Sequence, residues 1–445
     1  MSQAVLRKSI CGLAAVLALG GCGGKAPAPV PEAPESPEGT VRVQLTSYQQ
    51  TYQEDILAAC REQFPSLDVQ ISQDERWTDA IDTIRTELMS GGGPDVLFDP
   101  HLFFEDIDKT MNTRVFADLL PLVERDFGTD GLNPRVLPAG RRDGKQYVLP
   151  LTYNMPLLLT TEEALAQAGV NGERCKESQL AILEEAARYA ERTENTPAFY
   201  SSPFFALYFP DLLGLPFLDY EKRTADFSFP EYRQAVELYK PFYPFDILED
   251  DDMIFTPLDG YRHIKNREAV FECYNFNTGE ELFWNASALA GEEHPQLVPM
   301  AAQDGKYSAW VYQSAAIPAS CKNPEAAWAF LKVMLSPEIQ NNWYNVRNLP
   351  VLSSCLEDRI SASQKEAGEP MEEMVSGSQI ILAPLSDAFY QEFRRITENI
   401  GHTAFTYSYA STTTLRQMEP YYKGERSFES CLEELENTAM IYMSE

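Results

Sequence analysis

Basic residues are few in this chain. Its 445 residues include 36 lysines and arginines against 67 aspartates and glutamates, which gives a formal net charge of −31 and a pI near 4.5. A nucleic-acid backbone or an anionic membrane surface would repel such a protein, because binding to either depends on clusters of basic side chains. The composition therefore argues against nucleic acid as a partner.

Histidine is also scarce, and the common catalytic motifs are missing. The chain has 4 histidines and no C-x-x-C pair, which disfavours a zinc, histidine-rich or thioredoxin-like site. It also lacks a G-x-S-x-G elbow, an H-E-x-x-H pair and a Walker loop. We therefore expect no metal or other cofactor, and each histidine should lie at the surface or in a hydrogen bond. Beyond the N-terminal region the cysteines are scattered, and the sequence does not decide whether any of them pair.

Long apolar runs are absent except near the N-terminus. Residues 10–19 form an apolar stretch behind two basic residues, too short for a bilayer crossing but typical of a secretory signal. The following Leu-Gly-Gly-Cys, which ends at Cys22, resembles the lipobox of bacterial lipoproteins; the alternative is an ordinary signal with a chance cysteine. We expect a signal peptide over 1–21, then a lipidated Cys22 and a Pro-rich tether over 22–39.

The first part of the folded body has a regular alternation of strands and helices. Two alternating apolar stretches and one short apolar run predict strands, and two stretches of helical periodicity separate them. The predicted order is strand 41–45, helix around 56–64, strand 67–71, helix around 81–88 ending at the glycine triple 91–93, and strand 94–98. This order predicts a parallel sheet, in which ligands bind beyond the carboxyl ends of the strands.

Residues 143–159 form the stretch that connects the parts of the body. An Asp-Gly turn opens an apolar run in which Pro150 and Pro156 each remove a hydrogen-bond donor, with Thr152, Tyr153 and Asn154 between them. We interpret the stretch as a crossover from one domain to another; the alternative is an edge strand of a single sheet.

Later in the chain, the residues 361–379 are rich in Ser, Glu and Gly and are expected to form an exposed connection.

Several motifs in this order are similar to those of one protein family. The segments that carry the similarity are Glu87–Phe98, Asp143–Pro150, Ala316–Ala319, Lys322–Lys332 and Lys423–Ser430. Together they resemble the extracellular solute-binding proteins of carbohydrate-importing ABC systems, the maltose-binding type of family 1. The resemblance covers nearly all of residues 40–445, with a match in pattern alone over about 170–265.

The resemblance implies an α/β fold with two lobes, each a mainly parallel sheet flanked by helices, and a hinge between them. Lobe 1 would comprise 40–152 with 311–352, and lobe 2 would comprise 153–310 with 353–445. Such a protein is a monomer that is anchored by lipid on the extracellular face of the cell membrane, and it delivers its solute to permease subunits. It is not an enzyme.

A sugar offers a C–H face and a rim of hydroxyls, so its site needs aromatic rings and planar polar side chains. The family layout places such groups on the loops that face the cleft. The residues expected to bind ligand are Tyr48, Trp77, Asp99, Tyr153, Asn154, Tyr274, Asn275, Asn277, Trp310, Tyr312 and Arg347.

Two other functions are compatible with the sequence. A solute sensor or another surface lipoprotein could keep the same fold without feeding a transporter. A glycoside-active enzyme would need two carboxylates at a set separation, for which Asp99 and Glu280 are candidates.

Overall fold

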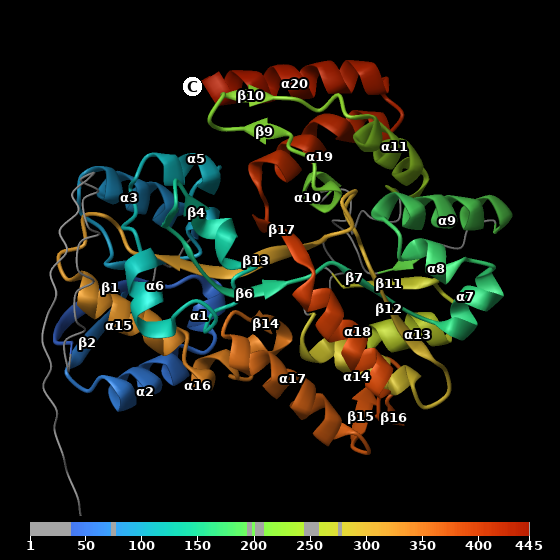
Figure 1. The fold of residues 1–445 in the computed structure, drawn as a ribbon, viewed down its shortest axis with the longest axis horizontal. Coiled ribbons are helices and arrows are strands. Elements are labelled where there is room, and N and C mark those ends of the chain that lie inside the picture. The colour runs from blue at the N-terminus through green and yellow to red at the C-terminus, as the bar shows by residue number, and fades with distance from the viewer. Residues whose placement is uncertain are drawn as a thin grey trace, which may run out of the picture. The chain divides into compact units, whose positions relative to one another are not determined.

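The computed structural model describes residues 37–72, 77–193, 198–200, 209–243, 258–274 and 278–444, without the side chains of 77–80, 200 and 209. These residues belong to one compact unit that runs from Pro34 to Glu445. Figure 1 labels its helices and strands.

The strands are β1 (Gly39–Gln44), β2 (Leu67–Ser72), β3 (Val96–Phe98), β4 (Arg141–Arg142), β5 (Lys145–Gln146), β6 (Leu149–Asn154), β7 (Leu157–Thr161), β8 (Phe199–Tyr200), β9 (Leu218–Asp219), β10 (Thr224–Ala225), β11 (Phe271–Tyr274), β12 (Pro295–Pro299), β13 (Tyr307–Ala316), β14 (Leu349–Pro350), β15 (Pro370–Glu373), β16 (Ser378–Ile381) and β17 (Ile400–Phe405). The helices are α1 (Ser47–Gln50), α2 (Gln53–Gln63), α3 (Trp77–Met89), α4 (Pro100–Phe103), α5 (Ile107–Asn112), α6 (Leu120–Phe127), η1 (Leu137–Gly140), α7 (Glu162–Ala168), α8 (Gly172–Cys175), α9 (Gln179–Arg192), α10 (Phe209–Leu213), α11 (Pro230–Tyr239), η3 (Lys240–Phe242), α13 (Asp259–Lys265), α14 (Glu280–Leu289), α15 (Pro324–Met334), α16 (Pro337–Gln340), η4 (Asn345–Arg347), α17 (Ser353–Glu366), α18 (Asp387–Glu398), α19 (Tyr409–Tyr422) and α20 (Phe428–Ser444).

The larger sheet contains the predicted strand–helix alternation. Strand β1 pairs in parallel with β2 and with β3, as the sequence predicts. The strand order is β14-β6-β13-β3-β1-β2, and β17 pairs in parallel with the first half of β13. The long strand β13 returns in the opposite direction and pairs antiparallel with both β3 and β6. Figure 1 shows β13 and β6 side by side in the middle of the molecule.

The chain changes from one sheet to another at the predicted crossover. Strand β6 lies inside the larger sheet, between β14 and β13, whereas β7 belongs to a second sheet of order β12-β7-β11-β8. Only Met155 and Pro156 separate the two strands. The chain therefore passes from one sheet to the other within these two residues, and the edge-strand alternative is wrong.

The expectation of mainly parallel sheets needs a correction. In the second sheet, β7 pairs antiparallel with β11 and with β12, and only β11 and β8 are parallel. Both sheets are therefore mixed. The physical reason is the short connections. Strand β7 follows β6 after two residues, and β13 follows β12 without a helix between them. These strands are therefore not part of βαβ units, which would require parallel pairing.

Side-chain caps fix several helix starts where the sequence signals them. Asn323 accepts a hydrogen bond from the Ala326 amide at the start of α15, and Pro324 takes the first helical position. Ser178 caps α9 in the same way. Helix α15 then packs against β1 and α2 (Figure 1), where the fully buried Trp328 belongs to the core of the larger sheet.

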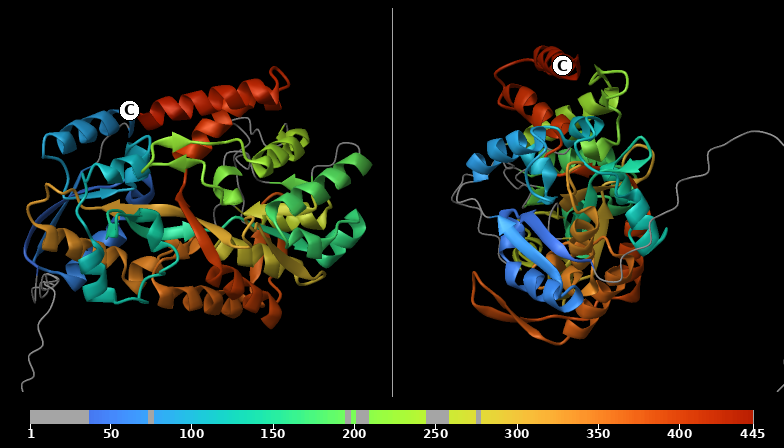
Figure 2. Two further views of the ribbon diagram at one scale, coloured as in Figure 1. Left: turned by 45° about the horizontal axis from the view of Figure 1, so that its top comes forward. Right: turned by 90° about the vertical axis from the view of Figure 1, so that its left-hand side faces the viewer.

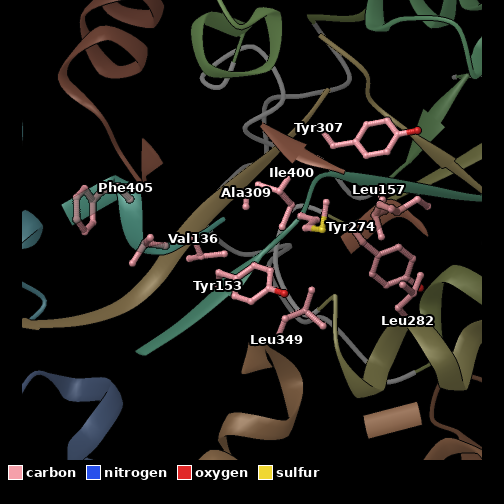
Figure 3. Packing of buried hydrophobic residues seen from close by; sticks show 14 of the residues in the cluster. Val136, Tyr153, Leu157, Tyr274, Leu282, Tyr307, Ala309, Leu349, Ile400 and Phe405 are labelled. Atoms are coloured by element: carbon pink, nitrogen blue, oxygen red, sulfur yellow. The ribbon is translucent and has the colours of Figure 1, made fainter. Parts of the chain in front are cut away.

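A second hydrophobic cluster lies on the helices that flank the smaller sheet, where α19 and α20 lie side by side (Figure 2). A third cluster joins the two sheets, because it includes Tyr153 on β6, Leu157 on β7 and Tyr274 on β11 (Figure 3). Each such side chain contributes about 1.5–3 kcal/mol through its burial. The crossover is therefore embedded in a continuous apolar core.

The prediction for residues 361–379 is half right. Most of the segment is exposed, but it is not an irregular connection: it contains the end of α17 and most of the antiparallel hairpin of β15 and β16. The alternation of this short polar hairpin is too weak to be recognised, because both of its faces are largely solvated.

The six cysteines of the folded body are all free.

Candidate functional site

Asp99 organises the carboxyl ends of β1 and β3. It directly follows β3 with a left-handed backbone (φ 45°), and its side chain is fully buried. One carboxylate oxygen accepts hydrogen bonds from Thr46 Oγ1 at 2.9 Å and Gln49 Nε2 at 3.0 Å. The other accepts from the Ser314 amide at 2.7 Å. Asp99 thus fixes the short helix α1 against β13.

Burial raises the pKa of Asp99 to about 6, although the three donors favour its charged form. Since both oxygens are occupied by protein donors, this carboxylate positions its neighbours. This arrangement counts against the hypothesis that Asp99 acts as the acid or base of a glycoside-active enzyme.

The helix that Asp99 fixes presents Tyr48 to Tyr312 on β13, with 5.2 Å between the ring centroids. The hydroxyls of Tyr48 and Tyr344 both lie near that of Tyr312 and influence its pKa. Burial raises the pKa of all three phenols, so they remain neutral and can both donate and accept hydrogen bonds.

More aromatic rings continue this group. Tyr344 stacks on Tyr52 at 5.4 Å, and Trp343 packs against Tyr344 at 5.8 Å. Trp343 is 56% exposed and Tyr407 is 41% exposed. Burial raises the pKa of Tyr407, and its electrostatic interaction with Tyr48 raises it further. We call Tyr48, Tyr52, Tyr312, Trp343, Tyr344 and Tyr407 the aromatic cluster.

Planar polar side chains lie among these rings. The Tyr52 hydroxyl donates to Gln313 Oε1 at 3.0 Å, and Gln313 Nε2 donates to Asn345 Oδ1 at 3.1 Å. Arg347, at the end of η4, is exposed beside this network. The arrangement offers neutral hydroxyls, amides, one guanidinium and ring faces, which is the chemistry that a sugar requires.

The structure brings some of the predicted ligand residues together and separates others. Tyr48 and Tyr312 meet in the aromatic cluster, close to Arg347 on η4, with Asp99 buried behind them. Tyr153, Tyr274 and Trp310 are almost completely buried in apolar clusters. The side chain of Trp77 and the residues Asn275 and Asn277 lie outside the described part of the chain.

Asn154 has a structural position at the crossover. Its side-chain oxygen accepts from the Thr278 amide at 3.1 Å and the Thr278 hydroxyl at 2.9 Å, and its nitrogen donates to Asn348 Oδ1 at 2.7 Å. The Gly279 amide in turn donates to the Arg347 carbonyl at 2.9 Å. This polar junction connects the crossover with the segments that follow β11 and precede β14.

The cluster members Tyr52, Trp343, Tyr344 and Tyr407 were not among the predicted site residues. A weak signal existed for Trp343 and Tyr344, since they lie close in the sequence to Arg347, which was among the expected ligand residues. Tyr407 follows β17, a strand that the sequence did not predict.

The four histidines are all hydrogen-bonded, as expected. His101 is hydrogen-bonded to Ser314 and Thr406, and burial lowers its pKa to about 3. His263 is hydrogen-bonded to Glu272, His294 to Glu163 and His402 to Asp304. In the described ranges, no three His, Cys, Asp or Glu side chains are grouped so that they could hold a metal ion. None of the described helices combines the length and apolar character that a bilayer crossing requires.

No family model and no curated protein sequence matches the chain. Solved structures do match. The sugar-binding protein MalE from Xanthomonas citri superposes with a TM-score of 0.65 over 91% of this chain and 98% of its own, at 16% identity. A putative oligosaccharide periplasmic-binding protein from Synechococcus sp. MITs9220 gives 0.61 over 91% and 99%, at 17% identity.

The chain has the two-lobed periplasmic-binding-protein fold. A family 1 extracellular solute-binding protein from Alicyclobacillus acidocaldarius agrees, with a TM-score of 0.59 over 93% of this chain and 100% of its own, at 15% identity. The crossover leads from the larger sheet to the smaller one, and the chain returns to the larger sheet between β12 and β13. The aromatic cluster lies where β13 meets the carboxyl ends of β1 and β3.

Proposed function

We propose that this chain is an extracellular solute-binding protein that captures a mono- or oligosaccharide and delivers it to the permease of an ABC importer. One observation carries the proposal: neutral tyrosines, amides and an exposed tryptophan from four separate segments converge beyond β1 and β3. Ligands of open α/β sheets bind at this edge. The solved structures with this fold include the GacH receptor of Streptomyces glaucescens in complex with acarbose.

Capture proceeds by closure of two lobes, 40–152 with 311–352 and 153–310 with 353–445. The crossover between β6 and β7 and the long strand β13 connect the two sheets and can act as hinges. A ligand that contacts both lobes binds the closed state more tightly and shifts the population toward it. Binding, and not catalysis, is the whole task of the protein.

Residues 1–21 direct export in this proposal, and Cys22 carries the lipid that anchors the protein at the extracellular face of the membrane. The apolar stretch and the Leu-Gly-Gly-Cys motif support this location. The tether 22–39 leaves the folded body free to approach a permease. The protein works as a monomer without a cofactor.

A thermal-shift screen with mono- and oligosaccharides tests the proposal. We expect at least one sugar to raise the melting temperature, and Tyr312→Phe to weaken its binding about ten-fold, because one hydroxyl contributes about 1.4 kcal/mol. Tyr261→Phe, on α13 outside the aromatic cluster, is the matched control and should bind normally. A response to peptides or polyamines with none to sugars would overturn the carbohydrate assignment.

A further inference from the structure

Helix α5 meets two elements that belong to the other proposed lobe. Helix α5 is part of lobe 1, whereas α20 and the turn between β9 and β10 are part of lobe 2. Figure 1 shows the C-terminal end of α20 beside α5 at the top of the molecule, whereas β6 and β7 lie in its middle. Contacts between these elements therefore connect the lobes at a distance from the crossover.

Lys109 on α5 forms one of these contacts. Its Nζ donates a hydrogen bond to the carbonyl oxygen of Tyr442 at 2.8 Å and lies 4.1 Å from the centroid of the Tyr442 ring. This carbonyl belongs to the end of α20, where the helix dipole favours a positive charge. Tyr442 also stacks on Tyr409 of α19, with 3.9 Å between the ring centroids. One ammonium group thus binds both the backbone and an aromatic ring of the C-terminal helix.

Asp106, the residue that precedes α5, forms the other contact. Its side chain is buried. One carboxylate oxygen accepts from the Lys109 amide at 3.0 Å and caps α5, and the other accepts from the Tyr220 hydroxyl at 2.7 Å. Tyr220 lies in the turn between β9 and β10. A hydrogen bond to a carboxylate is about twice as strong as one between neutral groups, so this contact adds to the first.

The two contacts lie beside a cavity of about 490 Å³ between the lobes. Asp108 lines this cavity from lobe 1, and Tyr220 lines it from lobe 2. The cavity therefore belongs to the space in which the proposed solute site lies. Asp106, Lys109 and Tyr442 do not line it, so these side chains can join the lobes without touching a solute there.

We propose that Asp106 and Lys109 form a latch with Tyr220 and Tyr442, and that this latch favours the closed arrangement of the lobes with or without solute. The inference rests on the proposed function, because it requires lobes that open and close. The apparent affinity for a solute depends on the population of the closed state. The latch therefore raises this affinity through contacts outside the sugar site.

Small-angle X-ray scattering in sugar-free buffer tests the latch. We expect Lys109→Met, which keeps the aliphatic stem and removes the charge, to have a larger radius of gyration than wild type, because the open population increases. Lys222→Met is the matched control and should keep the wild-type radius, since Lys222 pairs with Asp219 inside lobe 2 at 2.7 Å. An unchanged far-UV circular dichroism spectrum excludes unfolding as the cause of a larger radius.

Tyr220→Phe removes the hydroxyl that binds Asp106 and should enlarge the radius in the same way. Its test contains no ligand, so the position of Tyr220 in the cavity wall does not affect the result. A wild-type radius in either Lys109→Met or Tyr220→Phe would overturn the latch.

The sugar found by the thermal-shift screen gives a second measurement. It should bind Lys109→Met about ten-fold more weakly than wild type, and at saturation it should restore the wild-type radius of the bound state. An unchanged affinity of Lys109→Met would also overturn the latch. If no sugar binds, the sugar-free radii still test the latch, so its failure and the failure of the proposed function are distinguishable.

Discussion

At the scale of single residues, Asp99 shows how a buried carboxylate can organise a site without contacting a ligand. Its oxygens connect α1 to β13 through Thr46, Gln49 and the Ser314 amide. The rings of Tyr48 and Tyr312 meet because these two elements are fixed together. The cost is a charged group in the interior, which burial disfavours.

The raised pKa of Asp99 predicts a pH-dependent stability. The folded value of about 6 lies above the ordinary 3.8, so the contribution of this group is fully present below pH 3.8 and is lost as the pH rises through 6. The change corresponds to about 3 kcal/mol. We therefore expect the difference in unfolding free energy between wild type and Asp99→Asn to fall by roughly this amount between pH 4 and 7.

Urea unfolding of both proteins at several pH values measures this difference. Comparing the two proteins cancels the effects of Asp211 and Glu280, whose pKa values burial also raises to about 7. A difference that is the same at pH 4 and pH 7 would show that Asp99 ionises normally in the folded state.

At the scale of elements, the crossover from β6 to β7 depends on the polar junction around Asn154. Three hydrogen bonds connect this side chain to Thr278 and Asn348, which precede α14 and β14. The junction and the apolar cluster of Tyr153, Leu157 and Tyr274 both cross from one sheet to the other. These contacts set the path of the chain where the two sheets meet.

Asn154→Ala should destabilise the protein by about 1–3 kcal/mol, because it leaves buried groups of Thr278 and Asn348 without partners. The exposed Gln70→Ala, which removes a surface hydrogen bond to Asp68, is the control and should cost less than about 0.5 kcal/mol. Urea unfolding gives both values. Combination with Asn348→Ala should cost less than the sum of the single variants, because the two side chains share one hydrogen bond. Equal effects of Asn154→Ala and Gln70→Ala would contradict the role of the junction.

At the scale of the whole molecule, the proposed function requires that two lobes move as units. The chain passes between the proposed lobes at three places, at the crossover, within β13 and after β14, which is compatible with a hinge. The apolar cluster that spans both sheets limits the motion to one that keeps these contacts packed.

Lobe closure predicts a smaller radius of gyration when the sugar found by the thermal-shift screen is bound. Small-angle X-ray scattering of the protein with and without that sugar measures the change. Tyr312→Phe should show the decrease only at higher sugar concentration, because its affinity is lower. An unchanged radius at saturation would mean that the ligand binds without closure.

The sequence by itself determined the local elements and their order. Alternating and helical periodicity located β1, β2, α2 and α3, and the two prolines marked the crossover. These features depend on interactions within a few residues, so the sequence states them directly. The antiparallel pairing of β7 and of β13 with their neighbours was not predicted, because it depends on where the chain returns after long separations. The hairpin of β15 and β16 was not predicted because both of its faces are largely solvated and its alternation is weak.

Only the tertiary structure decided which aromatic side chains meet. Trp310 and Tyr312 lie two positions apart on β13, yet Trp310 is buried in the core and Tyr312 joins the aromatic cluster. Tyr48 and Tyr312 are far apart in the sequence, as are Asp211 and Ser411, which are joined by a hydrogen bond. The side chains that share a site are set by the packing of distant segments, which no local pattern encodes.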